Sequence, residues 1–221
     1  MLDSQQISFT GGPKIATQAP SGRRSQAERR DQSEQALLIA AAEVIERDGV
    51  AAATFEAVGK QAGYSRALAS VRFGSKDGMV RAVIDFLASR LEERIAARIG
   101  AVESPLERII AYADAMLSEV EQDRLLRAYF VMMAGAVGHR SDTQVVFLAV
   151  HDEVRETLRA FILEGQGAGE IDPALDANIV ALSIGSLQLG ISVELLLDPD
   201  MDMVAMRRTV NAAILRILKA E

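Results

Sequence analysis

Apolar residues recur every three or four positions along most of the chain, a spacing that predicts amphipathic α-helices. Short stretches rich in Gly, Pro and Asp interrupt this spacing and separate one helix from the next. The sequence lacks both the apolar/polar alternation that marks strands and Asn-Gly hairpin turns. The predicted fold class is therefore all-α with nine helices, of which the last six are expected at residues 76–98, 105–121, 124–137, 142–164, 174–197 and 203–219.

A leader, a basic arm and a first helix are predicted at the start of the chain. Residues 1–22 are rich in Gly, Pro, Ser and Gln, a composition typical of disorder. The first helix is predicted over Gln32–Arg47, with Ser33 as its N-cap. Four arginines precede this helix and would either reach the minor groove and phosphates of DNA or remain solvated: Arg23, Arg24, Arg29 and Arg30.

Two short helices joined by a tight turn are predicted between Thr54 and Arg72. Thr54 is the expected N-cap of the first, which ends at Gly63, where a left-handed conformation turns the chain at no steric cost. Ser65 is the expected N-cap of the second. Two helices joined by a short, glycine-containing turn form a helix-turn-helix, whose second helix enters the major groove of DNA.

The side chains around this second helix suit a DNA surface. Arginine bonds the edge of guanine with two nitrogens, serine bonds several base edges or a phosphate, and apolar side chains lie against the thymine methyl group. Lys76 opens the following helix, where backbone N–H groups and the ammonium together bind phosphate. The expected DNA contacts are Thr54, Tyr64, Ser65, Arg66, Ala67, Leu68, Ser70, Val71, Arg72 and Lys76.

The stretch GYSRALASVRFGSKDGM resembles the DNA-binding domain of the tetracycline-repressor (TetR) family. The family pattern runs glycine, apolar, small polar, three variable residues, Leu, Tyr, x, His, Phe, x, x, Lys. The tyrosine of the pattern commonly contacts a phosphate, so the resemblance implies that Arg72 or Tyr64 replaces this contact here. The residues that match are Gly63, Tyr64, Ser65, Phe73 and Lys76, and those that differ are Ala69, Ser70 and Arg72.

The resemblance also implies a domain organisation and a mechanism. Residues 23–75 would bind DNA, and residues 76–221 would bind an effector and form a homodimer through the last two helices. Small residues such as Gly185 and Gly190, and apolar residues such as Val210 and Ile214, are expected at this interface, with intrachain packing as the alternative. The implied protein is a repressor, released from a palindromic operator in double-stranded DNA by a small apolar or amphipathic molecule. The lack of Cys and of an apolar signal core separately predicts a cytoplasmic location.

The charge distribution along the chain is consistent with an N-terminal DNA-binding part, the head, and an acidic remainder, the body. Its net charge is −7. Residues 21–81 carry 10 Lys/Arg against 8 Asp/Glu, whereas residues 82–221 carry 13 against 22. Repulsion between the acidic body and DNA would orient the weakly basic head toward the duplex.

The body of the chain offers residues for a small-molecule cavity. Residues 128–137, AYFVMMAGAV, are apolar on every side, which predicts that they lie inside the helical bundle. His151 interrupts an apolar run on a later helix, where it would either contact a ligand or be a satisfied, partly buried histidine. Plain core packing is the alternative for the whole set. The expected ligand contacts are Tyr112, Met116, Phe130, Met133, Val137, Phe147 and His151.

Catalytic and metal-binding patterns are sparse. The sequence contains no Cys and only two His, and neither His139 nor His151 belongs to an H-E-x-x-H motif. No uninterrupted apolar stretch of about 18 residues is present to span a membrane. We therefore expect no catalytic residue, metal, cofactor or membrane partner. The alternatives are a helical small-molecule carrier or enzyme with a merely structural helix-turn-helix, and a DNA binder indifferent to sequence.

Overall fold

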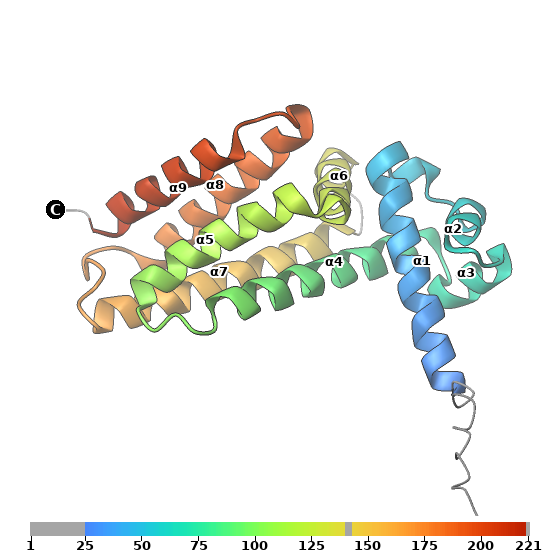
Figure 1. Ribbon diagram of the computed structural model, residues 1–221, viewed down its shortest axis with the longest axis horizontal. Coiled ribbons are helices and arrows are strands. Elements are labelled where there is room, and N and C mark those ends of the chain that lie inside the picture. The colour runs from blue at the N-terminus through green and yellow to red at the C-terminus, as the bar shows by residue number, and fades with distance from the viewer. Residues whose placement is uncertain (1–24, 140–142, 220–221) are drawn as a thin grey trace, which may run out of the picture.

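The computed structural model describes residues 25–139 and 143–219, and within them the chain forms nine α-helices, one 3-10 turn and no strand (Figure 1). The all-α prediction is confirmed. The predicted leader and the arginines Arg23 and Arg24 lie outside the described residues. The helices are α1 (Gln26–Asp48), α2 (Phe55–Ala62), α3 (Arg66–Phe73), α4 (Lys76–Ile99), α5 (Pro105–Gln122), α6 (Arg124–His139), α7 (Thr143–Gly167), α8 (Ala177–Leu197) and α9 (Met203–Leu218), with the 3-10 turn η1 (Val50–Ala52) between α1 and α2.

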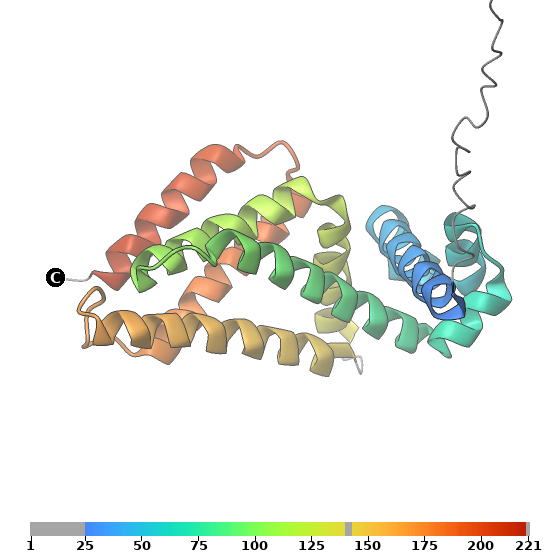
Figure 2. The ribbon, with the colours of Figure 1, turned by 60° about the horizontal axis from the view of Figure 1, so that its bottom comes forward.

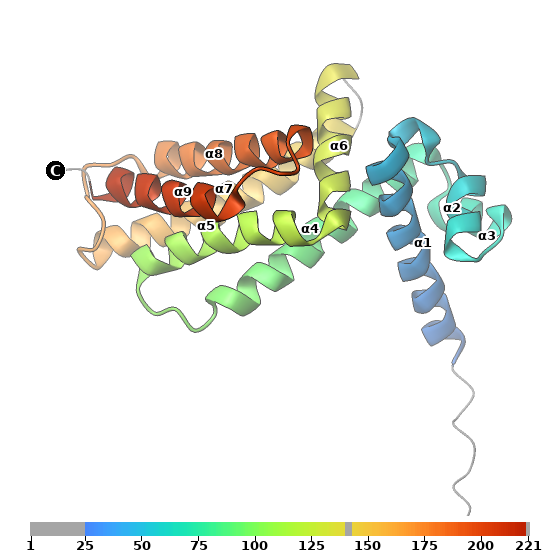
Figure 3. The ribbon, with the colours of Figure 1, turned by 45° about the horizontal axis from the view of Figure 1, so that its top comes forward.

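Helices α1, α2 and α3 form a small bundle at one end of the molecule, and the later helices form a longer body (Figure 1). Helix α4 belongs to both parts, because it packs on α1 and α3 and also on α5 and α7. Helix α6 stands across the end of the body and contacts α1 (Figure 3). The small bundle and the body are therefore joined through α4 and α6.

Helix α5 lies at the centre of the body, with α4, α7, α8 and α9 packed around it (Figure 2). Ser104 caps the helix and Pro105 occupies its first turn, where no N–H is needed. The buried residues Ile109, Ala113 and Leu117 are spaced by four and form one apolar stripe. Burial of a large apolar side chain contributes about 1.5–3 kcal/mol, so this stripe anchors the body.

The first helix begins earlier than the predicted Gln32. Ser25 Oγ accepts a hydrogen bond from the N–H of Glu28, and the Glu28 carboxylate accepts one from the N–H of Ser25. This reciprocal cap starts α1 upstream of Ser33, which is buried inside the helix and donates to the carbonyl oxygen of Arg30 at 2.8 Å. Two arginines assigned to the arm therefore lie within the first turns of α1: Arg29 and Arg30.

The later helices begin and end within three residues of the predicted positions. One expectation about their burial was wrong, because the last part of α6 is not enclosed. Ala134, Gly135 and Val137 are exposed, and the end of α6 projects beyond the neighbouring helices (Figure 3). The apolar residues 128–133 lie inside the body, as predicted.

Candidate DNA-binding surface and effector cavity

Two side-chain caps and one left-handed glycine shape the segment that contains α2 and α3. Thr54 Oγ1 accepts a hydrogen bond from the N–H of Ala57 at 3.1 Å, and Ser65 Oγ accepts one from the N–H of Leu68 at 3.1 Å. Gly63 ends α2 with a φ of 75°, which reverses the chain toward α3. These contacts confirm the predicted helix-turn-helix and place α3 as its second helix.

The close approach of α2 and α3 depends on Gly59, which the sequence analysis did not single out. A Cβ atom at this position would lie 3.0 Å from the carbonyl oxygen of Tyr64 and 3.1 Å from the nitrogen of Arg66. The N–H of Tyr64 donates to the carbonyl oxygen of Gly59 at 2.8 Å, and the Tyr64 side chain is half-exposed beside the turn. A side chain at position 59 would push α3 away. A glycine inside an apolar helix was the available signal.

Helix α3 has a buried side and an exposed side. Leu68 packs against the core, so it faces the bundle and not outward as expected, and Ser70 is partly buried. Arg66, Ala67 and Val71 are exposed, and Val71 retains 82% of its accessible surface. An exposed arginine and an exposed apolar residue on one short helix suit contact with base edges in a groove.

Three of the expected DNA contacts line one hollow on the surface: Thr54, Arg66 and Lys76. The Glu56 side chain shares this hollow and gives it one negative charge. Lys76 Nζ donates a hydrogen bond to the carbonyl oxygen of Ala51 at 2.9 Å, which holds the lysine over the segment before α2. The ammonium is exposed and has two further N–H groups that can bind a phosphate.

Arg72, another expected DNA contact, points toward α1. Its Nη2 donates to the carbonyl oxygen of Arg30 at 3.4 Å and to Ser33 Oγ at 3.3 Å. Its Nη1 lies 3.7 Å from the Glu34 carboxylate, and only 14% of the Arg72 side chain is exposed. In this structure Arg72 therefore ties α3 to α1.

A cavity of about 410 Å³ lies in the body, bounded by α4, α5, α6, α7 and α8. Four of the expected ligand contacts line it: Tyr112, Met116, Phe130 and His151. Three others do not, which corrects the prediction of the cavity wall. Met133 is packed in the core, Val137 is exposed on the projecting end of α6, and Phe147 is buried with its ring against that of Tyr129.

Helix α4 provides part of the cavity wall, although none of its residues was among the ligand contacts expected from the sequence. Leu87, Leu91 and Ile95 line the cavity at a spacing of four residues. This spacing was the available signal, since it places the three side chains on one face of a helix. Gln188 of α8 also lines the cavity, and its amide donates to the carbonyl oxygen of Ala113 at 3.2 Å. Because α4 also packs on α1 and α3, the cavity and the small bundle that contains the helix-turn-helix share one structural element.

Burial shifts the pKa values of three side chains that line the cavity. Burial lowers the pKa of His151, although the nearby Asp152 charge opposes this shift, so the imidazole is neutral near pH 7. Burial, with a smaller effect of the Glu92 charge, raises the pKa of Tyr112 to about 12. Burial also raises the pKa of the Tyr129 hydroxyl, which therefore stays protonated. The rings of Tyr129 and His151 stack with centroids 6.3 Å apart.

The sequence matches two family profiles. Residues 37–83 match the family described as "Bacterial regulatory proteins, tetR family", and residues 105–219 match "BetI-type transcriptional repressor, C-terminal". The second match alone covers more than half of the chain. The chain belongs to the TetR family of bacterial transcriptional regulators.

Known regulators resemble this TetR-family chain in sequence over part of their length or in fold. It is 32% identical over 109 residues to the "HTH-type transcriptional regulator BetI 1" of Chromohalobacter salexigens, an alignment that covers 49% of this chain and 54% of that protein. The chain thus matches about half the length of this relative. Bacillus subtilis FadR in complex with stearoyl-CoA superposes with a TM-score of 0.75 at 18% identity, over 83% of this chain and 98% of FadR. A TetR regulator from Chloroflexus aurantiacus gives 0.74 at 22% identity, over 85% and 94%.

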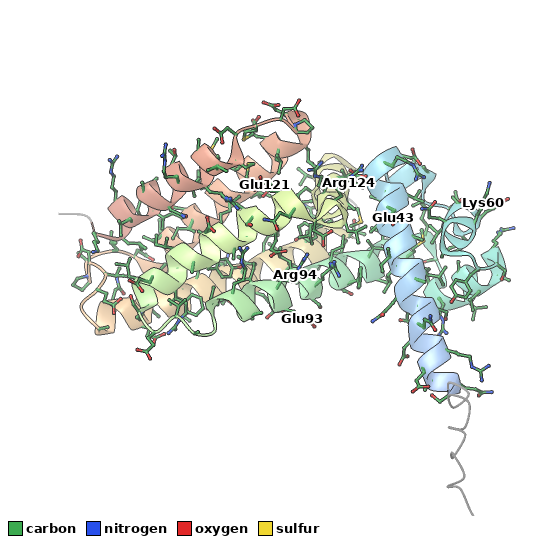
Figure 4. The ribbon with its side chains drawn as sticks, viewed as in Figure 1. Glu43, Lys60, Glu93, Arg94, Glu121 and Arg124 are labelled. Carbon is green, nitrogen blue, oxygen red and sulfur yellow. The ribbon has the colours of Figure 1, made fainter. Side chains whose placement is uncertain are left out.

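The TetR-family helix-turn-helix and the body meet at a network of ion pairs. On α4, Arg90 and Arg94 bind the Asp123 carboxylate at 2.9 and 2.8 Å, just before α6 begins. At the start of α6, Arg124 lies 3.1 Å from Glu46 of α1, and Figure 4 shows Arg124 at this junction. The start of α6 is therefore tied both to α4 and to the DNA-binding bundle.

Helices α8 and α9 of this TetR-family chain expose apolar side chains. The buried face of α9 contains Val210 and Ile214, which lie in the core of the chain itself and are therefore not at the interface expected from the sequence. Helix α8 is also long and apolar enough to cross a membrane, with a mean hydropathy of 1.8, a property shared by core helices of soluble proteins. The exposed apolar residues are Ile179, Leu182, Leu187, Leu197, Val204, Leu215 and Ile217.

Proposed function

We propose that this TetR-family regulator is a cytoplasmic homodimeric repressor that binds a palindromic operator through α3 and leaves it when a small molecule fills the cavity. The observation that carries the proposal is the hollow lined by Thr54, Arg66 and Lys76, which stand at the starts of α2, α3 and α4. Arg66 would contact a guanine edge, and Lys76 a phosphate. The family assignment supports a regulator over the carrier or enzyme alternative.

The homodimer would form through the exposed apolar residues of α8 and α9. Leucine and isoleucine side chains exposed on these two helices would be favourably buried against another protein surface. A two-fold dimer places the same face of each copy in contact, so residues along α8 would meet their own counterparts. Two α3 helices would then enter successive major grooves, about 34 Å apart.

Release of DNA would follow from the shared position of α4. Leu87, Leu91 and Ile95 form one wall of the cavity, and the same helix begins with Lys76 at the DNA surface. A molecule that displaces this wall would shift the start of α4 and change the spacing of the two α3 helices. A displacement of a few ångströms, compared with about 34 Å between grooves, would weaken simultaneous binding of both half-sites.

Arg66→Ala and Lys76→Ala test the roles of the two residues in DNA binding, because the two substitutions should change affinity and base preference differently. Arg66→Ala should cost about 1–3 kcal/mol on the preferred operator and relax discrimination at one base pair per half-site. Lys76→Ala should weaken binding to all sequences about equally and lower the salt dependence by about one phosphate contact. Fluorescence anisotropy on the operator and on single-base variants, across a salt series, measures both effects.

The same titrations separate the rival functions. An unchanged base preference in Arg66→Ala would make this arginine a phosphate contact, and base reading would then have to come from other residues of α3. Full affinity in both variants would contradict the proposed DNA surface and favour a carrier or enzyme with a structural helix-turn-helix. Equal affinity of the unmodified protein for all duplexes would indicate a DNA binder indifferent to sequence.

A further inference from the structure

The wall of the cavity in the body includes a buried hydroxyl group, that of Tyr129, which could form a hydrogen bond with a ligand. Tyr129 is 9% exposed and lines the cavity, and its hydroxyl has no hydrogen-bond partner among the residues that the structure describes. A buried polar group without a partner costs about 1–3 kcal/mol, and native proteins rarely leave one unpaired. Burial raises the pKa of the Tyr129 hydroxyl and keeps its proton in place, so this group can donate a hydrogen bond to an acceptor on the ligand.

A second donor lies on the cavity wall. Within the described part of the chain, Arg155 Nε is buried and has no hydrogen-bond acceptor. Arg155 follows His151 by one turn of α7, and His151 stacks on the Tyr129 ring, so the three side chains belong to one region of the wall. Both available groups, the tyrosine hydroxyl and the arginine N–H, need a ligand that accepts hydrogen bonds.

Charges around the cavity disfavour an anionic ligand. The Arg155 guanidinium is paired with Asp152 at 3.0 Å, so it carries little uncompensated positive charge. Glu92 and Glu153 line the cavity as well, and both are exposed. With His151 neutral, the charged groups of the wall sum to a net negative charge that would repel a carboxylate or phosphate.

The net negative charge of the wall would attract a cation, but the ring contacts and the hydrogen-bond donors at this end of the cavity disfavour one. A cation binds over the open face of an aromatic ring. The Tyr129 ring has His151 stacked on one face, while Phe130 and Phe147 meet it in edge-on contacts at 5.3 and 5.0 Å. A cation would also offer no acceptor to the Tyr129 hydroxyl or to Arg155 Nε.

We propose that the cavity binds an uncharged, largely apolar molecule whose carbonyl oxygen, or another neutral acceptor, receives a hydrogen bond from the Tyr129 hydroxyl. The apolar body of this molecule lies along Leu87, Leu91 and Ile95 of α4. A volume of about 410 Å³ falls within the range of cavities that hold drug-sized ligands. The inference rests on the proposed function, in which this cavity is the effector site.

Three probes with similar alkyl chains and different head groups test the ligand class: methyl nonyl ketone, decanoate and decyltrimethylammonium. Isothermal titration calorimetry of the full chain should show that the ketone binds about tenfold or more tightly than either charged probe, because burial of a charge is costly. Tighter binding of decanoate or of the ammonium would overturn the assignment. Absence of binding by the ketone would overturn it as well.

Tyr129→Phe tests the residue assignment. The variant should keep its fold, since the hydroxyl that it removes contributes no hydrogen bond to the described structure. The ketone should bind about three- to tenfold more weakly, the value of one hydrogen bond, while binding of decyltrimethylammonium, which has no acceptor, stays the same. Tyr64→Phe is the matched control for ketone binding, because it removes a tyrosine hydroxyl that lies outside the cavity. Equal losses in both variants would overturn the role of Tyr129.

Operator binding, measured on the same samples, separates this inference from the proposed function. Loss of ketone binding with intact operator affinity would overturn the ligand class and leave the DNA-binding function standing. Ketone binding by a protein without operator affinity would support the ligand class and contradict the proposed function. We expect the protein to bind both the ketone and the operator, and the ketone to lower operator affinity.

Discussion

Arg72→Ala distinguishes a residue that positions α3 from one that contacts DNA. The guanidinium makes two hydrogen bonds to α1, at 3.3 and 3.4 Å, and lies 3.7 Å from the half-exposed carboxylate of Glu34. We expect the variant to fold with α3 less firmly held against α1. Operator affinity should then fall on every sequence, without a change in base preference, because the exposed side chains of α3 are unchanged.

The size of the effect follows from the geometry of these contacts. Hydrogen bonds from a charged donor are worth about 1.5–3 kcal/mol at good geometry, but those of Arg72 are long, and the ion pair with Glu34 adds less than about 1 kcal/mol. A total loss of about 1–2 kcal/mol is expected, which lowers the Tm of a chain of this size by about 2–8 °C. Arg72→Lys should lose nearly as much, because lysine lacks the fork that reaches Ser33 and the Arg30 carbonyl together.

Thermal unfolding, and operator binding across a salt series, measure the two consequences of Arg72→Ala. A lower Tm with an unchanged salt slope supports the role in positioning α3. An unchanged Tm with a salt slope reduced by about one would refute it, because that result marks a direct phosphate contact, as the sequence alone had suggested.

Two further predictions concern the body of the protein. Gly190→Arg should give monomers that stay folded, because a Cβ at this exposed helical position meets no neighbouring atom within 4 Å and arginine favours the helix by about 1 kcal/mol over glycine. Sedimentation should show dimers for the unmodified protein and for the control Ala97→Arg on α4. A dimeric Gly190→Arg would place the interface elsewhere. Burial lowers the pKa of His151 in the folded chain, so the unfolded chain takes up the proton more readily, and stability should fall as the pH drops below about 6.5. Urea unfolding at neutral and acidic pH should show a smaller loss for His151→Asn, whereas an equal loss would mean that other groups cause the pH dependence.

The helix-turn-helix could be predicted from the sequence because its determinants are local. The caps at Thr54 and Ser65 and the turn at Gly63 each depend on residues within one helical turn. The start of α1 was missed for a related reason: composition assigned the segment around Ser25 to an arm, although Ser25 and Glu28 form a capping box.

The cavity wall and the partner of Arg72 could not be predicted in the same way. Periodicity shows which side of a helix is apolar, but not whether that side meets packed atoms, as Met133 does, or empty space, as Leu91 does. Arg72 contacts residues about forty positions earlier in the chain, and no local pattern reports such a contact. The fold was thus accessible from local signals, whereas the site depends on long-range packing.

Recognition of a specific DNA sequence through α3 is the central claim, and selection from random duplexes tests it most directly. The selected sequence should be a palindrome whose half-sites are centred about one helical turn, or a small multiple of it, apart. The protein should bind it about a thousandfold or more tightly than unselected duplexes at the same salt concentration. Recovery of no common sequence, with equal affinity for selected and random DNA, would contradict the account.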